Sequence, residues 1–155
     1  MSREELIRAI IGKRGEMSTE TIMFHQAVAD EIGLHITDHK SLDLIRQFGP
    51  MPAGRLAELT GLTTGAITGT IDRLEKTGYV RRTSDREDRR KTIVEPAGNK
   101  RLERKIELIL IPLHERMHKQ LSSYSDSELA FLLDALTKSI EQIREESRRL
   151  RSHKV

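Results

Sequence analysis

The sequence lacks cysteine and tryptophan altogether, and aromatic residues make up only 3% of its 155 positions. Without cysteine, the chain can form neither a disulfide nor a thiol-based redox switch. Single-stranded nucleic acids are commonly bound by stacking their bases on aromatic side chains, and such side chains are scarce here. If the protein binds nucleic acid, its composition therefore favours a duplex.

Long apolar runs are also missing from the sequence. No stretch approaches the roughly 20 consecutive apolar residues of a membrane-spanning helix. The first residues, MSREELIRAIIGKRG, contain acidic groups and too short an apolar segment for a secretory signal. These absences predict a cytoplasmic protein with no membrane partner. A chain of 155 residues has room for one domain, alone or with an oligomerisation element.

Residues 53–80 carry the pattern of two short helices joined by a tight turn. Apolar residues fall on one face of each helix: Leu56 and Leu59 in the first, and Ile67, Ile71 and Leu74 in the second. A hydroxyl at Thr63 or Thr64 can cap the second helix by accepting a hydrogen bond from a free N-terminal amide. Gly78 suits the left-handed conformation that ends such a helix.

The outer face of the second helix consists of small and hydrogen-bonding residues. They are Thr63, Thr64, Gly65, Thr68, Gly69, Asp72 and Arg73. Another molecule can approach a helix backbone closely across such a face. The recognition helix of a helix-turn-helix needs this property, because it enters a major groove about 12 Å wide and presents short side chains to base edges. A helical hairpin inside a bundle is the alternative interpretation.

A charged loop between two strand-like segments follows this hairpin. The predicted strands are residues 79–83 and 91–95, and SDREDRR lies between them. Six basic and three acidic residues occupy the eleven positions 81–91, in a chain whose formal net charge is only +3. Positive charge is therefore concentrated beside the candidate recognition helix, and we interpret the segment as a wing. The alternative is an exposed turn rich in both signs of charge.

The segments before the hairpin are predicted to be helical. We expect a short amphipathic helix over residues 3–11 that Gly12 and Gly15 interrupt, followed by a second helix over residues 18–32. A third helix should be capped by Thr37 or Asp38 and end at Gly49.

Two long helices are predicted after the wing, one over residues 97–122 with a kink at Pro112 and one that begins with a Ser125–Glu128 capping box. Their apolar residues recur at three- and four-residue steps and exceed what one small domain can cover. A homodimer would bury the excess and would set two recognition helices one duplex turn apart. An intrachain hairpin packed on the winged unit is the alternative.

The segments GLHITDHKSLDLI, GPMPAGRLAELTGLTTGAITGTIDRLEKTGYVRR and DREDRRKTIVEPAG resemble the multiple antibiotic resistance regulator (MarR) family of winged-helix transcription factors. The similarity covers roughly residues 20–143, judged by motif order and spacing. It implies a mainly α fold with a small two- or three-stranded β wing. Residues 1–36 would supply N-terminal dimerisation helices, residues 37–96 the winged helix-turn-helix, and residues 97–155 the C-terminal dimerisation helices and a basic tail.

The resemblance also implies a function, with no catalytic residues, cofactor or metal. The chain would be a sequence-specific regulator of transcription that binds a pseudo-palindromic double-stranded operator as a homodimer, and a repressor released by a ligand. The implied recognition-helix contacts are Thr63, Thr64, Gly65, Thr68, Gly69 and Arg73, and the implied wing contacts are Arg86, Asp88, Arg89 and Arg90.

Within the wing, the family signature of Asp, one residue and Arg falls on Asp88 and Arg90. An arginine suits a narrow minor groove because of its negative potential, and Asp88 can hold the loop so that Arg90 points outward. Where the family usually has Leu-Thr, this chain has Pro96-Ala97. This departure leaves open where the returning strand ends and which residue caps the next helix.

Small aromatic or phenolic compounds commonly release members of this family from DNA. In this chain His35, His39 and Arg46 are candidate partners for such an effector, and simple exposure of the three side chains is the alternative.

One motif points to another class of protein. His114-Glu115-Arg116-Met117-His118 matches H-E-x-x-H, in which two histidines bind zinc and the glutamate activates water. The next histidine downstream is His153 in the charged tail, so a zinc hydrolase is much less favoured than a regulator. A metal-responsive regulator using His114 and His118 with His25, His35 or His39 stays open, and ordinary surface or interface histidines are the favoured interpretation.

Overall fold

A computed structural model of the protein describes residues 1–85, 88 and 92–152. The chain forms two compact units, Met1–Ile106 and Glu107–Val155. The first holds helices α1 (Arg3–Ile32), α2 (Ile36–Phe48), α3 (Ala53–Thr60) and α4 (Thr64–Lys76), and strands β1 (Met51–Pro52), β2 (Val80–Ser84) and β3 (Thr92–Pro96). Helix α5 (Lys100–Leu121) begins in the first unit and continues in the second, which also holds α6 (Asp126–Ser152).

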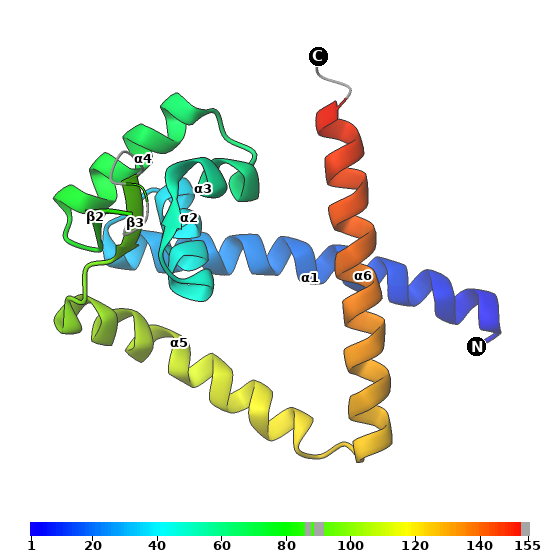
Figure 1. Cartoon of the computed structure of the whole chain (residues 1–155). Helices are drawn as coiled ribbons and strands as arrows, with labels where there is room; N and C mark the ends of the chain where they lie inside the picture. The colour runs from blue at the N-terminus through cyan, green and yellow to red at the C-terminus, as the bar shows by residue number, and fades with distance from the viewer. Residues whose placement is uncertain (86–87, 89–91, 153–155) are drawn as a thin grey trace. The chain divides into compact units, whose positions relative to one another are not determined.

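Helix α1 is one uninterrupted helix of 30 residues, so the expected break at Gly12 and Gly15 was wrong. A glycine inside a helix costs only about 1 kcal/mol, which a long cooperative helix tolerates. A capping box formed by Ser2 and Glu5 starts α1, and Gly33, with a φ of 73°, ends it. The C-terminal half of α1 packs beside α2, whereas its N-terminal half extends beyond α2–α4 (Figure 1).

Helix α2 is capped by His35 and not by Thr37 or Asp38, as we had expected. The backbone N–H of Thr37 donates to Nδ1 of His35 at 3.3 Å. Asp38 lies inside the helix, where its buried side chain has a partner on another element. The helix ends at Gly49, as predicted.

The three strands form an antiparallel sheet in the order β1-β3-β2. The predicted pair of strands is present, each beginning one residue later than expected. Strand β3 continues through Pro96, which pairs with Val80, and the N–H of Ala97 donates to the carbonyl of Tyr79. Asn99 then caps α5 through its side chain, which accepts from the N–H of Leu102 at 3.4 Å. Strand and cap are therefore both complete despite the departure from the family pattern.

The core of the first unit lies between the end of α1, helices α2–α4, the sheet and the start of α5. Its buried apolar residues are Val28, Ala29, Ile32, Leu34, Leu42, Ile45, Met51, Leu56, Ile67, Ile71, Leu74, Tyr79, Val80, Val94 and Ile106. The predicted inward faces of α3 and α4 are confirmed except at Leu59, which is only half-buried. Burial raises the pKa of Tyr79, whose hydroxyl donates to the carbonyl of Ile32.

The second unit contains the remainder of α5 and the whole of α6. Helix α5 begins at Lys100, three residues later than expected, and runs on through Pro112, where the expected kink stays a prediction. The capping box at the start of α6 is confirmed, because the N–H of Ser125 donates to Glu128 at 2.8 Å and the N–H of Glu128 donates to the Ser125 hydroxyl at 3.4 Å. Across the described part of the chain, no helix is both long and apolar enough to span a membrane.

Candidate nucleic-acid interface

Helix α4 has one buried face and one open face. Thr63 caps it by accepting a hydrogen bond from the N–H of Ala66 at 3.3 Å. The inner face buries Ile67, Thr70, Ile71 and Leu74 against the core. The opposite side carries every residue that sequence reasoning assigned to the DNA-reading face, and all of them are exposed except Gly69, which is half-buried.

No described atom of another element crowds the two glycines of this open face. A methyl group built on Gly65 would meet nothing within 4 Å, and one built on Gly69 would meet only the flexible tip of Arg73 at 3.4 Å. The hydroxyl of the exposed Thr68 donates to the carbonyl of Thr64 at 2.9 Å, so its oxygen can still accept a hydrogen bond. The face can therefore approach a base edge closely and offer it an acceptor and a small apolar surface.

Arg73 differs from the other residues on this face because another helix holds it. Its Nε and Nη2 donate to the two carboxylate oxygens of Asp38 on α2, both at 2.7 Å, and Nη2 also donates to Thr70 at 3.1 Å. The hydrogen bond to Asp38 raises the pKa of Arg73. The guanidinium therefore anchors α4 to α2. Sequence reasoning had named Asp38 only as a possible cap of α2 and missed its pairing with Arg73, because the two residues are 35 positions apart and no local pattern links them.

The arginines at the base of the wing also have partners within the chain. Arg82 on β2 forms ion pairs with Asp72 and Glu75 of α4, and its backbone N–H donates to Glu75 at 3.0 Å. Arg81 pairs with Glu95 of β3 at 2.7 Å. Arg82 thus neutralises the exposed acidic residues Asp72 and Glu75 of α4 and ties β2 to that helix.

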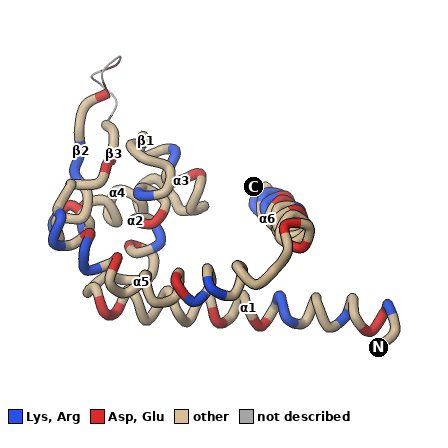
Figure 2. Tube along the Cα trace, turned by 90° about the horizontal axis from the view of Figure 1, so that it is seen from below, with Lys and Arg blue, Asp and Glu red and all other residues tan. Residues whose placement is uncertain are grey.

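The wing is the β2–β3 hairpin, which projects beyond the helices of its unit (Figure 2). Asp88 is half-buried, and its backbone N–H donates to Oδ1 of Asp85 at 3.0 Å. Arg86, Arg89 and Arg90 lie outside the described residues.

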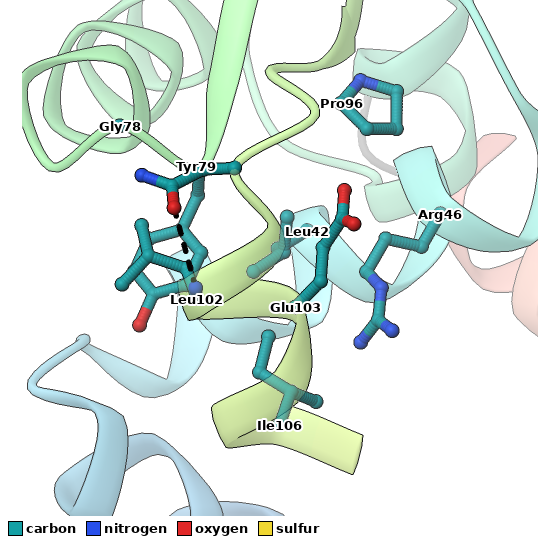
Figure 3. Close-up of a pocket in the computed structure, with 9 residues that line it drawn as sticks. Leu42, Arg46, Gly78, Tyr79, Pro96, Leu102, Glu103 and Ile106 are labelled. Atoms are coloured by element: carbon teal, nitrogen blue, oxygen red, sulfur yellow. Dashed lines mark hydrogen bonds between the residues drawn. The ribbon is translucent and has the colours of Figure 1, made fainter.

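The three candidate effector residues do not share one pocket. His35 is exposed and uses Nδ1 to cap α2, and His39 is buried on the α1 side of α2. Arg46 lines a cavity of about 10 Å³ together with Tyr79 and residues at the start of α5 (Figure 3). A cavity of this volume holds roughly one water molecule. Figure 3 shows Arg46 and Glu103 on one side of it and Tyr79 and Leu102 on the other.

The histidines of the H-E-x-x-H match are exposed on α5. Among the described residues, the one group of three side chains placed to hold a metal ion is His25, His39 and Asp43. Burial lowers the pKa of His39, although Asp43 opposes the shift. As metal ligands, sequence reasoning had considered His25 and His39 only together with His114 and His118, and it had not identified Asp43.

Comparisons with known proteins agree with this architecture. The model of the MarR family matches residues 34–92. The uncharacterized HTH-type transcriptional regulator YcgE of Bacillus subtilis (strain 168) is 37% identical over 150 residues, which cover 97% of this chain and 96% of that protein.

Solved structures share the fold. A MarR family protein from Bacillus stearothermophilus superposes with a TM-score of 0.68 at 17% identity, over 93% of this chain and 99% of the other. Reduced AbfR bound to DNA superposes with a TM-score of 0.53, also at 17% identity, over 91% of this chain and 96% of the other. With its helix-turn-helix, its three-stranded sheet and a relative that matches nearly the whole chain, the protein belongs to the MarR family of DNA-binding transcriptional regulators.

Proposed function

We propose that this chain is a homodimeric repressor that binds a pseudo-palindromic duplex operator and is released from it by a small aromatic or phenolic compound. The observation that carries the proposal is the open face of α4, where small residues leave the backbone accessible while the opposite face is buried. One α4 from each protomer would enter one of two successive major grooves.

In this proposal the bases are read by the small residues of α4, namely Thr63, Thr64, Gly65, Thr68 and Gly69. Arg73 positions the helix through Asp38, and its side chain, 56% exposed, keeps a free edge that can reach a phosphate. Of the wing residues, Arg86 and Arg89 contact the neighbouring DNA phosphates and Arg90 enters the minor groove. Asp88 supports the wing loop.

In the proposed dimer, residues 1–36 and 97–155 form the interface between the two chains, and residues 37–96 bind DNA. Helix α6 buries none of its residues within one chain. Its exposed large apolar residues are Phe131, Leu133, Leu136, Ile140, Ile143 and Leu150. Leu133, Leu136, Ile140 and Ile143 recur at steps of three and four and so form one stripe. The N-terminal half of α1 exposes a second apolar set that includes Ile10 and Ile11. A second copy of the chain supplies matching stripes, and two-fold symmetry fits a pseudo-palindrome.

The proposed effector acts where α2, the turn at Gly78 and Tyr79, the end of β3 and the start of α5 meet. Arg46 lines the cavity there and offers a cation for a phenolate or carboxylate, and Leu42, Leu102 and Ile106 offer apolar contacts for a ring. The cavity of about 10 Å³ must enlarge to admit such a compound. Enlargement would move α2, which carries the Asp38 anchor of α4, and so would alter the position of the recognition helix. We propose no catalytic role for the chain.

Selection of bound duplexes from a random-sequence library tests the proposal. We expect enrichment of two inverted half-sites whose centres lie about 10 base pairs apart. Sedimentation of the selected complex should give two chains per duplex, and the operator placed over a promoter should lower reporter expression until a phenolic compound is added. A single unpaired half-site bound by one chain would contradict the proposal.

A further inference from the structure

Three side chains at the junction of α1 and α2 converge on one point. His25 comes from α1, and His39 and Asp43 are four residues apart on one face of α2. One ligand atom of each residue lies within 4.8 Å of the other two. We propose that His25, His39 and Asp43 form a binding site for a divalent transition-metal ion of the zinc type.

The separations suit metal ligands better than hydrogen-bond partners. Oδ2 of Asp43 lies 3.6 Å from Nδ1 of His25 and 3.7 Å from Nδ1 of His39. Both distances exceed the usual range for a hydrogen bond between nitrogen and oxygen. With metal–ligand bonds of about 2.0–2.1 Å, ligands at the corners of a tetrahedron are about 3.4 Å apart. A small inward movement of the three side chains would therefore complete the geometry.

The ring nitrogens at this point lack hydrogen-bond partners among the described atoms. His39 is only 1% exposed, and neither its Nδ1 nor its Nε2 makes a hydrogen bond. Nδ1 of His25 is likewise buried without a hydrogen-bond partner. Buried polar atoms in folded proteins are nearly always paired, so several unpaired nitrogens around one carboxylate call for a common ligand. A cation would satisfy Nδ1 of His25, one ring nitrogen of His39 and the Asp43 carboxylate together.

The donor set selects the class of ion. Two imidazoles and one carboxylate suit zinc, cobalt and nickel, whereas magnesium and calcium prefer sites made entirely of oxygen ligands. The side chains of His25 and Asp43 are 28% and 25% exposed, so an ion can enter and water can complete its coordination. The cluster shares no residue with the exposed His114 and His118 pair, which therefore supplies a matched control.

The test uses the full-length chain without an affinity tag, stripped of metal by a chelator. Zn²⁺ binding is measured by calorimetry, and Co²⁺ binding by visible absorption. We expect one ion per chain and a rise in the apparent melting temperature when Zn²⁺ is added. His25→Ala and Asp43→Asn should each weaken binding by more than about tenfold, because even supporting partners of metal ligands contribute that much. The double variant His114→Ala with His118→Ala should bind as the wild type does.

Three results would overturn the site: wild-type protein that binds neither ion, binding unchanged in both His25→Ala and Asp43→Asn, or binding lost in the His114 and His118 double variant. Circular dichroism of the metal-free proteins separates loss of binding from loss of folding. Should Asp43→Asn fail to fold, His25→Ala decides the outcome, because this side chain is partly exposed at the surface of α1.

Discussion

The carboxylate of Asp38 on α2 binds the guanidinium of Arg73 on α4 through two hydrogen bonds of 2.7 Å each. Asp38 is only 2% exposed, whereas more than half of the Arg73 side chain is accessible. The buried carboxylate thus holds an arginine of α4 and helps to set where the outer face of α4 lies relative to the rest of its unit.

Arg73→Ala should lower the free energy of unfolding, because it leaves the buried Asp38 carboxylate without its charged donor. We expect a loss of about 1–2 kcal/mol, at the lower end for such pairs because water can reach the exposed side of the pair. Urea denaturation measures it. Arg55→Ala is the matched control, since Arg55 forms an exposed pair with Glu58 on α3, and it should change stability by no more than about 0.5 kcal/mol. Equal effects of the two substitutions would show that the Asp38 pair is no more important than a surface ion pair.

Leu136→Asp should separate the proposed dimer without unfolding the chain. Leu136 is 51% exposed within one chain, so a charge there is readily hydrated in a monomer but would be buried in the dimer interface. Light scattering should show monomers at micromolar concentration, with loss of operator binding. Gln142→Asp adds the same charge to an exposed position of α6 and should leave the dimer intact. A monomeric wild type that binds its operator with full affinity would contradict this interpretation of α6.

Arg90→Ala should weaken operator binding more than Arg82→Ala does. Arg82 is occupied by Asp72 and Glu75, whereas the proposed role of Arg90 is in a minor groove. Losing Arg90 should also remove a preference for flanks rich in A·T pairs, whose minor grooves are narrow. Fluorescence anisotropy at several salt concentrations provides the measurement. Each lost phosphate contact should reduce the slope of log affinity against log salt concentration by about one unit.

Asp88→Ala discriminates between a shaped wing and a general patch of positive charge. Removing an acidic group makes the protein more positive, so simple charge counting predicts tighter binding. Support of the wing turn by Asp88 predicts weaker binding instead. Tighter binding by Asp88→Ala, with Arg90→Ala no worse than Arg82→Ala, would exclude the wing roles proposed for these residues.

Features set by neighbouring residues could be predicted from the sequence. The hydroxyl cap of α4, the apolar face of α4 and the Ser125–Glu128 capping box depend on residues within one or two turns of each other, and the structure contains all three. The sequence left the cap open between Thr63 and Thr64, and the structure has Thr63. Gly78 adopts the predicted left-handed conformation, with a φ of 79°.

Features set by tertiary context could not be predicted in this way. The long α1 tolerates Gly12 and Gly15 because helix formation is cooperative, although each glycine alone suggests a break. The His35 cap uses an imidazole nitrogen in a place where a hydroxyl or carboxylate is usual. The pairing of Asp38 with Arg73 joins helices that only the folded chain brings together.

Base preference after Thr68→Ala tests the central claim, that the open face of α4 reads a duplex. Thr77→Ala is the control, because the hydroxyls of Thr68 and Thr77 each donate to the carbonyl four residues earlier at 2.9 Å. The Thr77 hydroxyl also donates to the carbonyl of Leu74 at 3.0 Å, so the control should cost the helix at least as much. Affinities are measured for a panel of operators with single base-pair changes. We predict that Thr68→Ala loses about 1–3 kcal/mol of discrimination at one position of each half-site while Thr77→Ala keeps the wild-type profile. A uniform loss of affinity across the whole panel, or the same profile for both variants, would contradict the account.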